Sequence, residues 1–303
     1  MINMDLRDIE YFAVIAEHRH LGRAAAALGL GQPALSMSLR RLEKSAQTKL
    51  VKRTPKGVEL TAVGAALLTH VRRLRLAQDD LAREIADLSH ARAGDLRIGT
   101  SPANAEWLLP RVCSSLLREA TKVTVMAIVQ DNEGLLPALR RGELDFVVIH
   151  IRQDSYPDIE QVILREDEFV VYCSVHHRLA KRKSVMLRDL AEERWASTAA
   201  SASWLRRTSE ERGLLPPQLA LVSDSVALRL RTVASSDLLG IASKQVVEVA
   251  APHLRLRTLP VHNQNWIRPV AIAYRKDAYL SPAARRFIEL LKASAKTLGM
   301  DPP

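Results

Sequence analysis

The sequence predicts an N-terminal, all-α winged helix-turn-helix domain with a long linker helix, followed by a C-terminal α/β domain. Three observations predict this architecture. Short helical patterns fill residues 5–45, a heptad pattern of leucines runs through residues 61–91, and strands alternate with helices from residue 95 onward. The length of 303 residues suits two domains.

The composition is that of a globular protein with an excess of basic residues. Hydrophobic residues make up 47% of the chain, charged residues make up 26%, and the formal net charge is +10. These values exclude an intrinsically disordered chain. No apolar run reaches the roughly 18 residues of a membrane span, and the N-terminus lacks the pattern of a signal peptide. We therefore expect a cytoplasmic protein.

The N-terminal part predicts three short helices. Residues 5–17 and 32–45 carry apolar side chains close to helical spacing, and residues 21–28 are rich in alanine, the best helix former. Gly29 lies in the turn before the third helix, where a left-handed backbone is often needed, and Ala25 is small where two helices would cross. Two helices joined by a short turn containing glycine predict a helix-turn-helix.

A small basic wing follows these helices. Two β-like runs, 50–53 and 58–60, flank a Pro-Lys-Gly turn and predict a hairpin. Residues 40–56 contain seven basic residues and one acidic residue, Glu43, which gives a local charge of +6. Such a cluster is either a solvated surface or a contact surface for a polyanion such as nucleic acid.

The linker helix is predicted to begin after Thr61, which can cap it, and to run to about Ala91. Leucine recurs every seven residues within it, and β-branched residues and one glutamine fill the intervening heptad positions, as in a leucine zipper. We favour a dimerisation helix over a helix packed on its own domain, and parallel and antiparallel pairing remain open. The predicted dimerisation positions are Leu67, Val71, Leu74, Gln78, Leu81, Ile85 and Leu88.

The remaining chain alternates strands with helices, which predicts a parallel sheet covered on both faces. One helix is predicted over about 104–119, and the start of the next is predicted to be delayed by Pro137. The last helix is predicted to have Ser281 as its N-cap and Gly299 past its end.

Residues 24–64 resemble the LysR-type transcriptional regulators. The shared motifs are Ala24-Ala25, Leu28, Gln32-Pro33-Ala34-Leu35-Ser36, Leu42-Glu43, Arg53-Thr54, and Leu60-Thr61 with Gly64. The sequence departs from the family at Gly31, where Ser or Thr is usual, and at Met37, where a long polar residue is usual. The rest of the chain resembles the family over nearly its whole length.

The resemblance implies a domain plan. Residues 1–60 would form the winged helix-turn-helix, residues 61–92 the linker helix, and residues 93–303 an effector-binding domain. That domain would have two subdomains crossed twice by the chain, as in periplasmic binding proteins. Subdomain I would comprise about 93–165 and 266–303, and subdomain II about 166–265.

The resemblance also implies a sequence-specific DNA-binding transcriptional regulator whose promoter binding is modulated by a small effector in the C-terminal domain. A recognition helix enters the major groove with its N-terminus first, so Gln32 can pair with adenine, and the basic wing can contact phosphates. The predicted DNA-binding residues are Gln32, Pro33, Ala34, Ser36, Met37, Arg40, Lys52, Arg53 and Thr54.

Polar residues at predicted strand ends and loops suit a small polar or anionic effector. Hydroxyl and backbone N–H groups at the start of a helix can hold an anion, although each Ser or Thr there is alternatively a plain helix cap. The predicted effector-binding residues are Thr100, Ser101, Gln130, His150, Thr198 and Ser201.

The predicted partners are double-stranded DNA, the effector and a second copy of the chain, as a homodimer or homotetramer, with RNA polymerase as a further candidate and no membrane. Neither catalytic residues, a metal site nor a cofactor is expected, because the sequence has no G-x-S-x-G, H-E-x-x-H or P-loop motif. Cys113 and Cys173 are expected to be packing thiols rather than a redox switch. The alternatives are a solute-binding or enzymatic α/β protein and an architectural DNA binder without a ligand.

Overall fold

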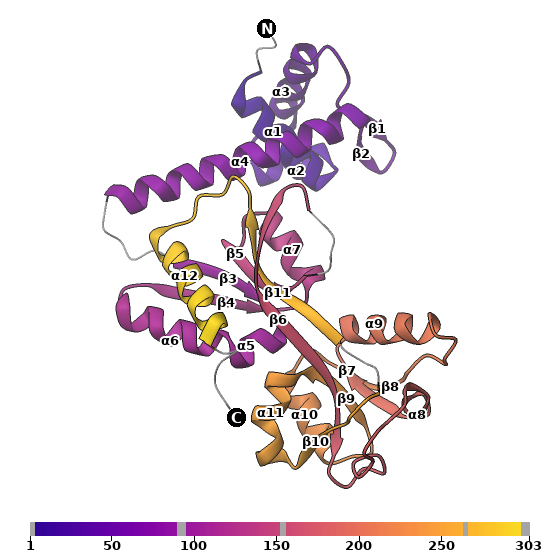
Figure 1. Ribbon diagram of the computed structural model, residues 1–303. Coiled ribbons are helices and arrows are strands. Elements are labelled where there is room, and N and C mark those ends of the chain that lie inside the picture. Colours follow the sequence, from indigo (N-terminus) through magenta and orange to yellow (C-terminus); the bar gives the residue numbers. More distant parts are fainter. Residues whose placement is uncertain (1–3, 90–94, 152–155, 263–265, 298–303) are drawn as a thin grey trace. The chain divides into compact units, whose positions relative to one another are not determined.

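A computed structural model describes residues 4–89, 95–151, 156–262 and 266–297 (Figure 1). The chain divides into two compact units, Met1–Arg83 and Glu84–Pro303. The domain boundaries given above remain predictions, because this division into compact units does not locate the ends of a linker segment.

The N-terminal unit contains the three predicted helices and the wing. Its elements are α1 (Leu6–His18), α2 (Leu21–Ala27), α3 (Gln32–Ser45), β1 (Val51–Thr54), β2 (Gly57–Leu60) and the beginning of α4 (Ala62–Ser89). Strands β1 and β2 pair antiparallel. Gly29 has a φ of 66°, which confirms the left-handed turn before α3. The Thr61 hydroxyl accepts a hydrogen bond from the Gly64 N–H at 3.0 Å and so caps α4 as predicted.

The C-terminal unit is a nine-stranded sheet covered by helices. Its strands are β3 (Asp95–Thr100), β4 (Thr124–Val129), β5 (Phe146–His150), β6 (Ile159–Ser174), β7 (Arg194–Ser197), β8 (Gln218–Val222), β9 (Leu239–Ser243), β10 (Leu256–Thr258) and β11 (Trp266–Arg275). Its helices are the end of α4, α5 (Pro102–Trp107), α6 (Leu109–Glu119), α7 (Asn132–Arg140), α8 (Leu187–Ala191), α9 (Ala199–Glu210), α10 (Val226–Ala234), α11 (Lys244–Leu254) and α12 (Pro282–Thr297).

The prediction of a parallel sheet is wrong for the strands in the middle of the sheet. The strand order is β4-β3-β5-β11-β6-β9-β7-β8, with β10 on β6. Pairing is parallel within the first half, β4-β3-β5, and within the second half, β9-β7-β8. The two crossing strands, β6 and β11, pair antiparallel with each other and with β5 and β9. Alternating strands and helices predict parallel neighbours only where a helix links consecutive strands, and β6 and β11 are long strands that pass between the halves.

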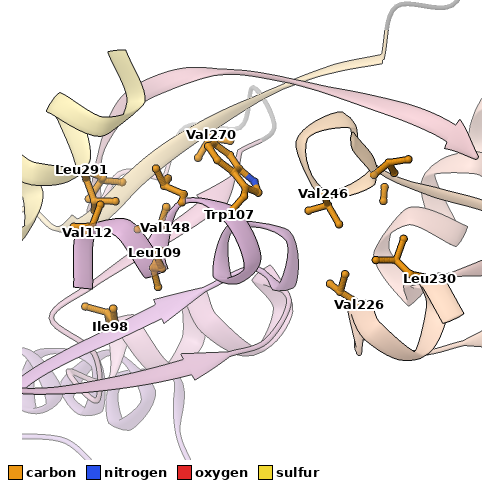
Figure 2. Packing of buried hydrophobic residues seen from close by; sticks show 14 of the residues in the cluster. Ile98, Trp107, Leu109, Val112, Val148, Val226, Leu230, Val246, Val270 and Leu291 are labelled. Carbon is orange, nitrogen blue, oxygen red and sulfur yellow. The ribbon is translucent and has the colours of Figure 1, made fainter. Parts of the chain in front are cut away.

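Three apolar clusters lie between the sheet of the C-terminal unit and the helices that cover it. The largest lies under α6 and α12 in the first half and under α10 and α11 in the second half. The opposite face is covered by α7 in the first half and by α8 and α9 in the second half. Figure 2 shows Trp107 of α5 between the buried residues of the first half and those of α10 and α11. The two halves therefore share one continuous apolar core on this side.

Local helix boundaries differ from the prediction at two prolines. The single helix predicted over 104–119 is two helices, α5 and α6, that meet at Leu108, and Pro110 lies in the first turn of α6 where its missing N–H costs nothing. Pro137 does not delay α7, which starts at Asn132 because Asp131 caps the Gly134 N–H at 3.1 Å. Helix α7 tolerates the proline while Leu135 and Leu139 are buried in the core.

The last helix begins as predicted, because the Ser281 hydroxyl accepts from the Ala284 N–H at 3.1 Å. The prediction for Gly299 falls outside the described residues. In the described part of the chain, no helix combines the length and apolar character that crossing a bilayer requires.

Candidate nucleic-acid interface and effector site

Helix α3 has two faces with different surroundings. Leu35, Leu39 and Leu42 are buried in the core of the N-terminal unit. Gln32, Pro33, Ala34, Met37 and Arg40 are exposed, and Ser36 is half-buried. Gly31 has an extended backbone and contributes no side-chain cap, so α3 starts without the hydroxyl that usually satisfies its first N–H groups. The first backbone N–H groups of α3, beside the exposed Gln32, therefore have no side-chain cap.

The angle of α3 is fixed by a buried carboxylate on α1. Asp8 accepts hydrogen bonds from the Ser38 hydroxyl at 2.5 Å and from the Arg41 guanidinium at 2.6 and 3.0 Å. Burial raises the pKa of Asp8, but the hydrogen bonds from Arg41 and Ser38 outweigh burial and hold it below its ordinary value. Ser38 and Arg41 thus serve the fold, which distinguishes them from their exposed neighbour Arg40.

The wing is tied to the helices by hydrogen bonds from both side chains and backbone. Glu43 accepts from the Leu50 N–H at 3.0 Å and from Lys49 Nζ at 2.7 Å. The Val58 N–H donates to the Arg19 carbonyl at 2.8 Å. At Gly57, whose φ is 135°, an added Cβ would lie 2.3 Å from that same carbonyl oxygen. The tip of the wing therefore requires glycine and holds one position relative to α1 and α2.

The predicted wing residues lie on β1. Lys52 and Arg53 are exposed, and Thr54 is half-buried beside the turn. The structure thus places the exposed start of α3 and two exposed basic side chains in the same unit, with the supporting residues underneath them buried. This arrangement suits a protruding helix that enters the major groove and a hairpin that contacts phosphates.

The heptad positions of α4 divide into two groups. Leu67 is partly buried and Val71 is 2% exposed, and both pack against the N-terminal core. The remaining positions are exposed, with Leu81 at 57% and Leu88 at 81%. The exposed group consists of Leu74, Gln78, Leu81, Ile85 and Leu88. Large exposed apolar side chains at this spacing are typical of a helix that pairs with another helix.

The structure brings together some of the predicted effector residues in the first half. The Ser101 hydroxyl lies 3.4 Å from His150 Nδ1. The Gln130 N–H donates to the Thr100 carbonyl at 3.1 Å, which places the end of β4 beside the end of β3. The Thr100 hydroxyl is fully buried and donates to the Val148 carbonyl at 3.2 Å, so it serves the fold.

In the second half, Thr198 is the N-cap of α9. Its hydroxyl accepts from the Ser201 N–H at 3.0 Å, which is the plain helix cap considered as the alternative. Ser201 itself is buried. Neither hydroxyl has a hydrogen bond to Ser101 or His150 among the interactions of the described residues.

Sequence reasoning missed the residues that surround His150. Asp167 Oδ2 lies 2.8 Å from His150 Nε2, and Ser243 donates to Asp167 Oδ1 at 2.8 Å. The rings of His150 and Phe169 meet edge to face at 5.1 Å. Arg268 stacks on Phe169 at 4.4 Å, and the ring of Trp204 lies 4.8 Å from the same guanidinium.

The second half also contains a small apolar hollow. It is lined by Leu187, Leu190, Ala191, Trp195, Leu205, Ser209, Leu215, Pro217 and Trp266. Within the described ranges, His, Cys, Asp and Glu side chains form no cluster of three or more that could hold a metal ion. Both cysteines are unpaired thiols.

Comparison with known proteins identifies related sequences over nearly the whole chain. The family model described as "LysR substrate binding domain" matches residues 89–296, and that described as "Bacterial regulatory helix-turn-helix protein, lysR family" matches residues 6–65. The HTH-type transcriptional regulator GbpR of Azospirillum brasilense is 29% identical over 97% of this chain and 87% of its own length. The SDS degradation transcriptional activation protein of a Pseudomonas species is 31% identical over 92% of this chain and 93% of its own length.

A solved structure supports the fold. Full-length CbnR in complex with its target DNA has a TM-score of 0.54 and 22% sequence identity. The likeness covers 96% of this chain and 100% of the CbnR chain.

Proposed function

The chain belongs to the LysR family of bacterial transcriptional regulators. From this family membership, we propose that the exposed start of α3 contacts the bases of the operator and that β1 contacts the phosphate backbone. The protein is a DNA-binding transcriptional regulator whose promoter binding is modulated by a small-molecule effector in the C-terminal domain. The proposal assigns base contacts to Gln32, Pro33, Ala34 and Ser36. It assigns phosphate contacts to Arg40, Lys52, Arg53 and Thr54.

One observation carries this assignment. The leucines of α3 are buried while Gln32, Pro33 and Ala34 at its start are exposed, and Asp8 and Glu43 fix the helix and the wing from beneath. A glutamine can pair bidentately with adenine, and Pro33 and Ala34 can lie against a thymine methyl group. Met37 is 58% exposed, and its flexible apolar side chain can lie against the same methyl group.

We further propose that Ser101, Gln130 and His150, together with Thr198 and Ser201 of the second half, line the effector site. Ser101 and His150 support this assignment, because they meet where two strands of the first half end. The chemistry of these side chains suits a small polar or anionic molecule that accepts and donates hydrogen bonds.

The exposed heptad positions of α4 support a homodimer through this helix, and a tetramer through further contacts. Since its target is chromosomal DNA, we place the protein in the cytoplasm. The relatives are named as transcriptional regulators, and we propose that the effector domain binds its ligand without converting it. RNA polymerase is the further partner through which a bound regulator would act.

Selection of genomic fragments retained by the purified protein would supply the operator. Gln32→Ala should then weaken binding to the operator by roughly tenfold or more while leaving binding to a scrambled duplex unchanged, because a bidentate base contact discriminates by about 1–3 kcal/mol. Arg53→Ala should weaken binding to both duplexes and lower the salt slope by about 0.9, because one phosphate contact is lost.

Arg7→Ala is the matched control, since Arg7 is an exposed arginine on α1 outside the proposed interface. It removes the same charge and should leave the operator preference intact. Equal losses on operator and scrambled duplex for Gln32→Ala would contradict base reading by α3. An Arg53→Ala salt slope equal to that of the unaltered protein would contradict the phosphate contact.

A further inference from the structure

A buried carboxylate lies where the two halves of the C-terminal unit meet. Asp167 is on the crossing strand β6, and its side chain is 1% exposed. His150, at the end of β5 in the first half, lies 2.8 Å from Oδ2 through its Nε2. Ser243, at the end of β9 in the second half, donates to Oδ1 at 2.8 Å. One carboxylate therefore joins a residue of each half to the strand that connects them.

These contacts fix the orientation of the His150 ring. An ionised carboxylate can only accept hydrogen bonds, so we assign the ring proton to Nε2, which donates it to Asp167 Oδ2. The other ring nitrogen, Nδ1, then lies on the side of Ser101, 3.4 Å from its hydroxyl. Ser101 does not use that hydroxyl to cap α5, so the hydroxyl and Nδ1 face each other at the proposed effector site.

The surroundings of Asp167 hold this arrangement in place. Phe169, two residues along the same face of β6, packs edge to face against His150. Arg268 is the register partner of Asp167 on β11 and stacks on Phe169. On the opposite face of β6, Glu168 pairs with Lys244 at 2.9 Å and so does not compete for His150. A buried acceptor that orients a histidine is a recurrent means of setting which ring nitrogen faces a ligand.

We propose that Asp167 is a positioning residue for the effector response: it presents His150 Nδ1 at Ser101 and, through Ser243, couples that ring to β9 and α11 of the second half. The proposal rests on the proposed role of Ser101 and His150 in the effector site. An effector that shifts the His150 ring must either break the bond to Asp167 or move the carboxylate that holds Ser243. Binding in the first half would thereby reach the second half through two hydrogen bonds.

Nitrogen and proton NMR of the full-length, histidine-labelled protein tests the positioning. We expect a protected, hydrogen-bonded proton on His150 Nε2, assigned by its absence in His150→Gln. In Asp167→Asn this proton should shift strongly or disappear, because a neutral amide is a weaker acceptor than a carboxylate. Glu168→Gln, the neighbouring acidic residue on β6, is the matched control and should leave it unchanged. An unprotonated Nε2 in the unaltered protein, or an unchanged signal in Asp167→Asn, would overturn the proposal.

Hydrogen exchange followed by mass spectrometry tests the coupling and does not need the Asp167 variant to fold. His150→Gln, a change in the first half, should speed exchange in residues 239–247 of the second half by about tenfold, as expected for loss of one charged hydrogen bond. His176→Gln, at an exposed histidine, is the control. Exchange no faster than in that control would refute the coupling.

Neither the NMR experiment nor the hydrogen-exchange experiment uses an effector. A negative result in either would therefore refute the role of Asp167 without refuting the proposed effector site. If the protein passed both tests but its stability never responded to any ligand, the effector site would be refuted, and Asp167 would position His150 without serving an effector response.

Discussion

At the residue scale, the contacts of Asp8 predict an acid-sensitive N-terminal unit. Because the pKa of Asp8 is lowered in the folded protein, its stabilising contribution is present above the ordinary aspartate pKa of about 3.9 and is lost as pH falls through the lower, folded value. Asp8→Asn should destabilise this unit by about 1–3 kcal/mol near neutral pH, since buried Ser38 loses an ionised acceptor.

Thermal denaturation followed across pH 3 to 7 measures this effect. The variant should show a flatter loss of stability at the acid end of that range than the unaltered protein. Glu17→Gln, at an exposed position of α1, should follow the unaltered protein at every pH. If Asp8→Asn and Glu17→Gln gave the same curve, the ion pair would contribute nothing to folding.

The environments of the two cysteines predict that the protein is insensitive to hydrogen peroxide. Burial raises the pKa of Cys173 to about 12, with the charge of Glu193 adding to the shift, and burial also raises the pKa of the half-buried Cys113. The reactive thiolate is therefore scarce at neutral pH. Treatment with hydrogen peroxide should leave operator binding unchanged, and intact-mass measurement should find both thiols reduced. Rapid oxidation of Cys173 in the folded protein would refute this prediction.

Some residues of the candidate effector site could be predicted from the sequence, and one could not. Ser101 and His150 could be predicted, because the ends of neighbouring parallel strands meet at one edge of a sheet. Asp167 could not, since it stands in the acidic run 166–168, which is typical of an exposed strand. Its burial depends on coverage by β11 and β9, whose residues are distant in sequence.

At the element scale, α4 predicts the oligomeric state. Leu81→Asp with Leu88→Asp should convert the dimer to a monomer that keeps its helix content, because both side chains are exposed and their loss leaves the core intact. Ala86→Asp adds one charge at an exposed position outside the heptad face and is the control. Sedimentation and circular dichroism measure the two quantities. A double variant that stayed dimeric would exclude this face as the dimer contact.

Elements with local signals could be predicted, and those without could not. The helices α1 to α4 and the hairpin β1-β2 follow from spacing, caps and turn residues that lie within each segment. The structure of strand β9 depends on packing against a distant strand: a Cβ on Gly240 would lie 2.2 Å from the Tyr172 ring. The antiparallel crossing of β6 and β11 likewise arises from long-range pairing.

At the scale of the whole molecule, the proposed dimer linked through α4 would carry two DNA-binding units. Once one unit binds its half-site, the second binds at a raised effective concentration, which increases affinity by about 10²–10⁴-fold without new contacts. The unaltered protein should therefore prefer a duplex with two half-sites over a duplex with one by a factor in this range.

The monomeric Leu81→Asp, Leu88→Asp variant should lose most of that preference while its affinity for the single half-site stays the same, because α3 and β1 are untouched. Gln32→Ala should do the reverse, weakening each half-site while preserving the ratio between the two duplexes. Fluorescence anisotropy with both duplexes at one salt concentration separates the effects, with Ala86→Asp as the control. If the monomeric variant kept the full preference for two half-sites, the two DNA-binding units would have to be coupled through a surface other than α4.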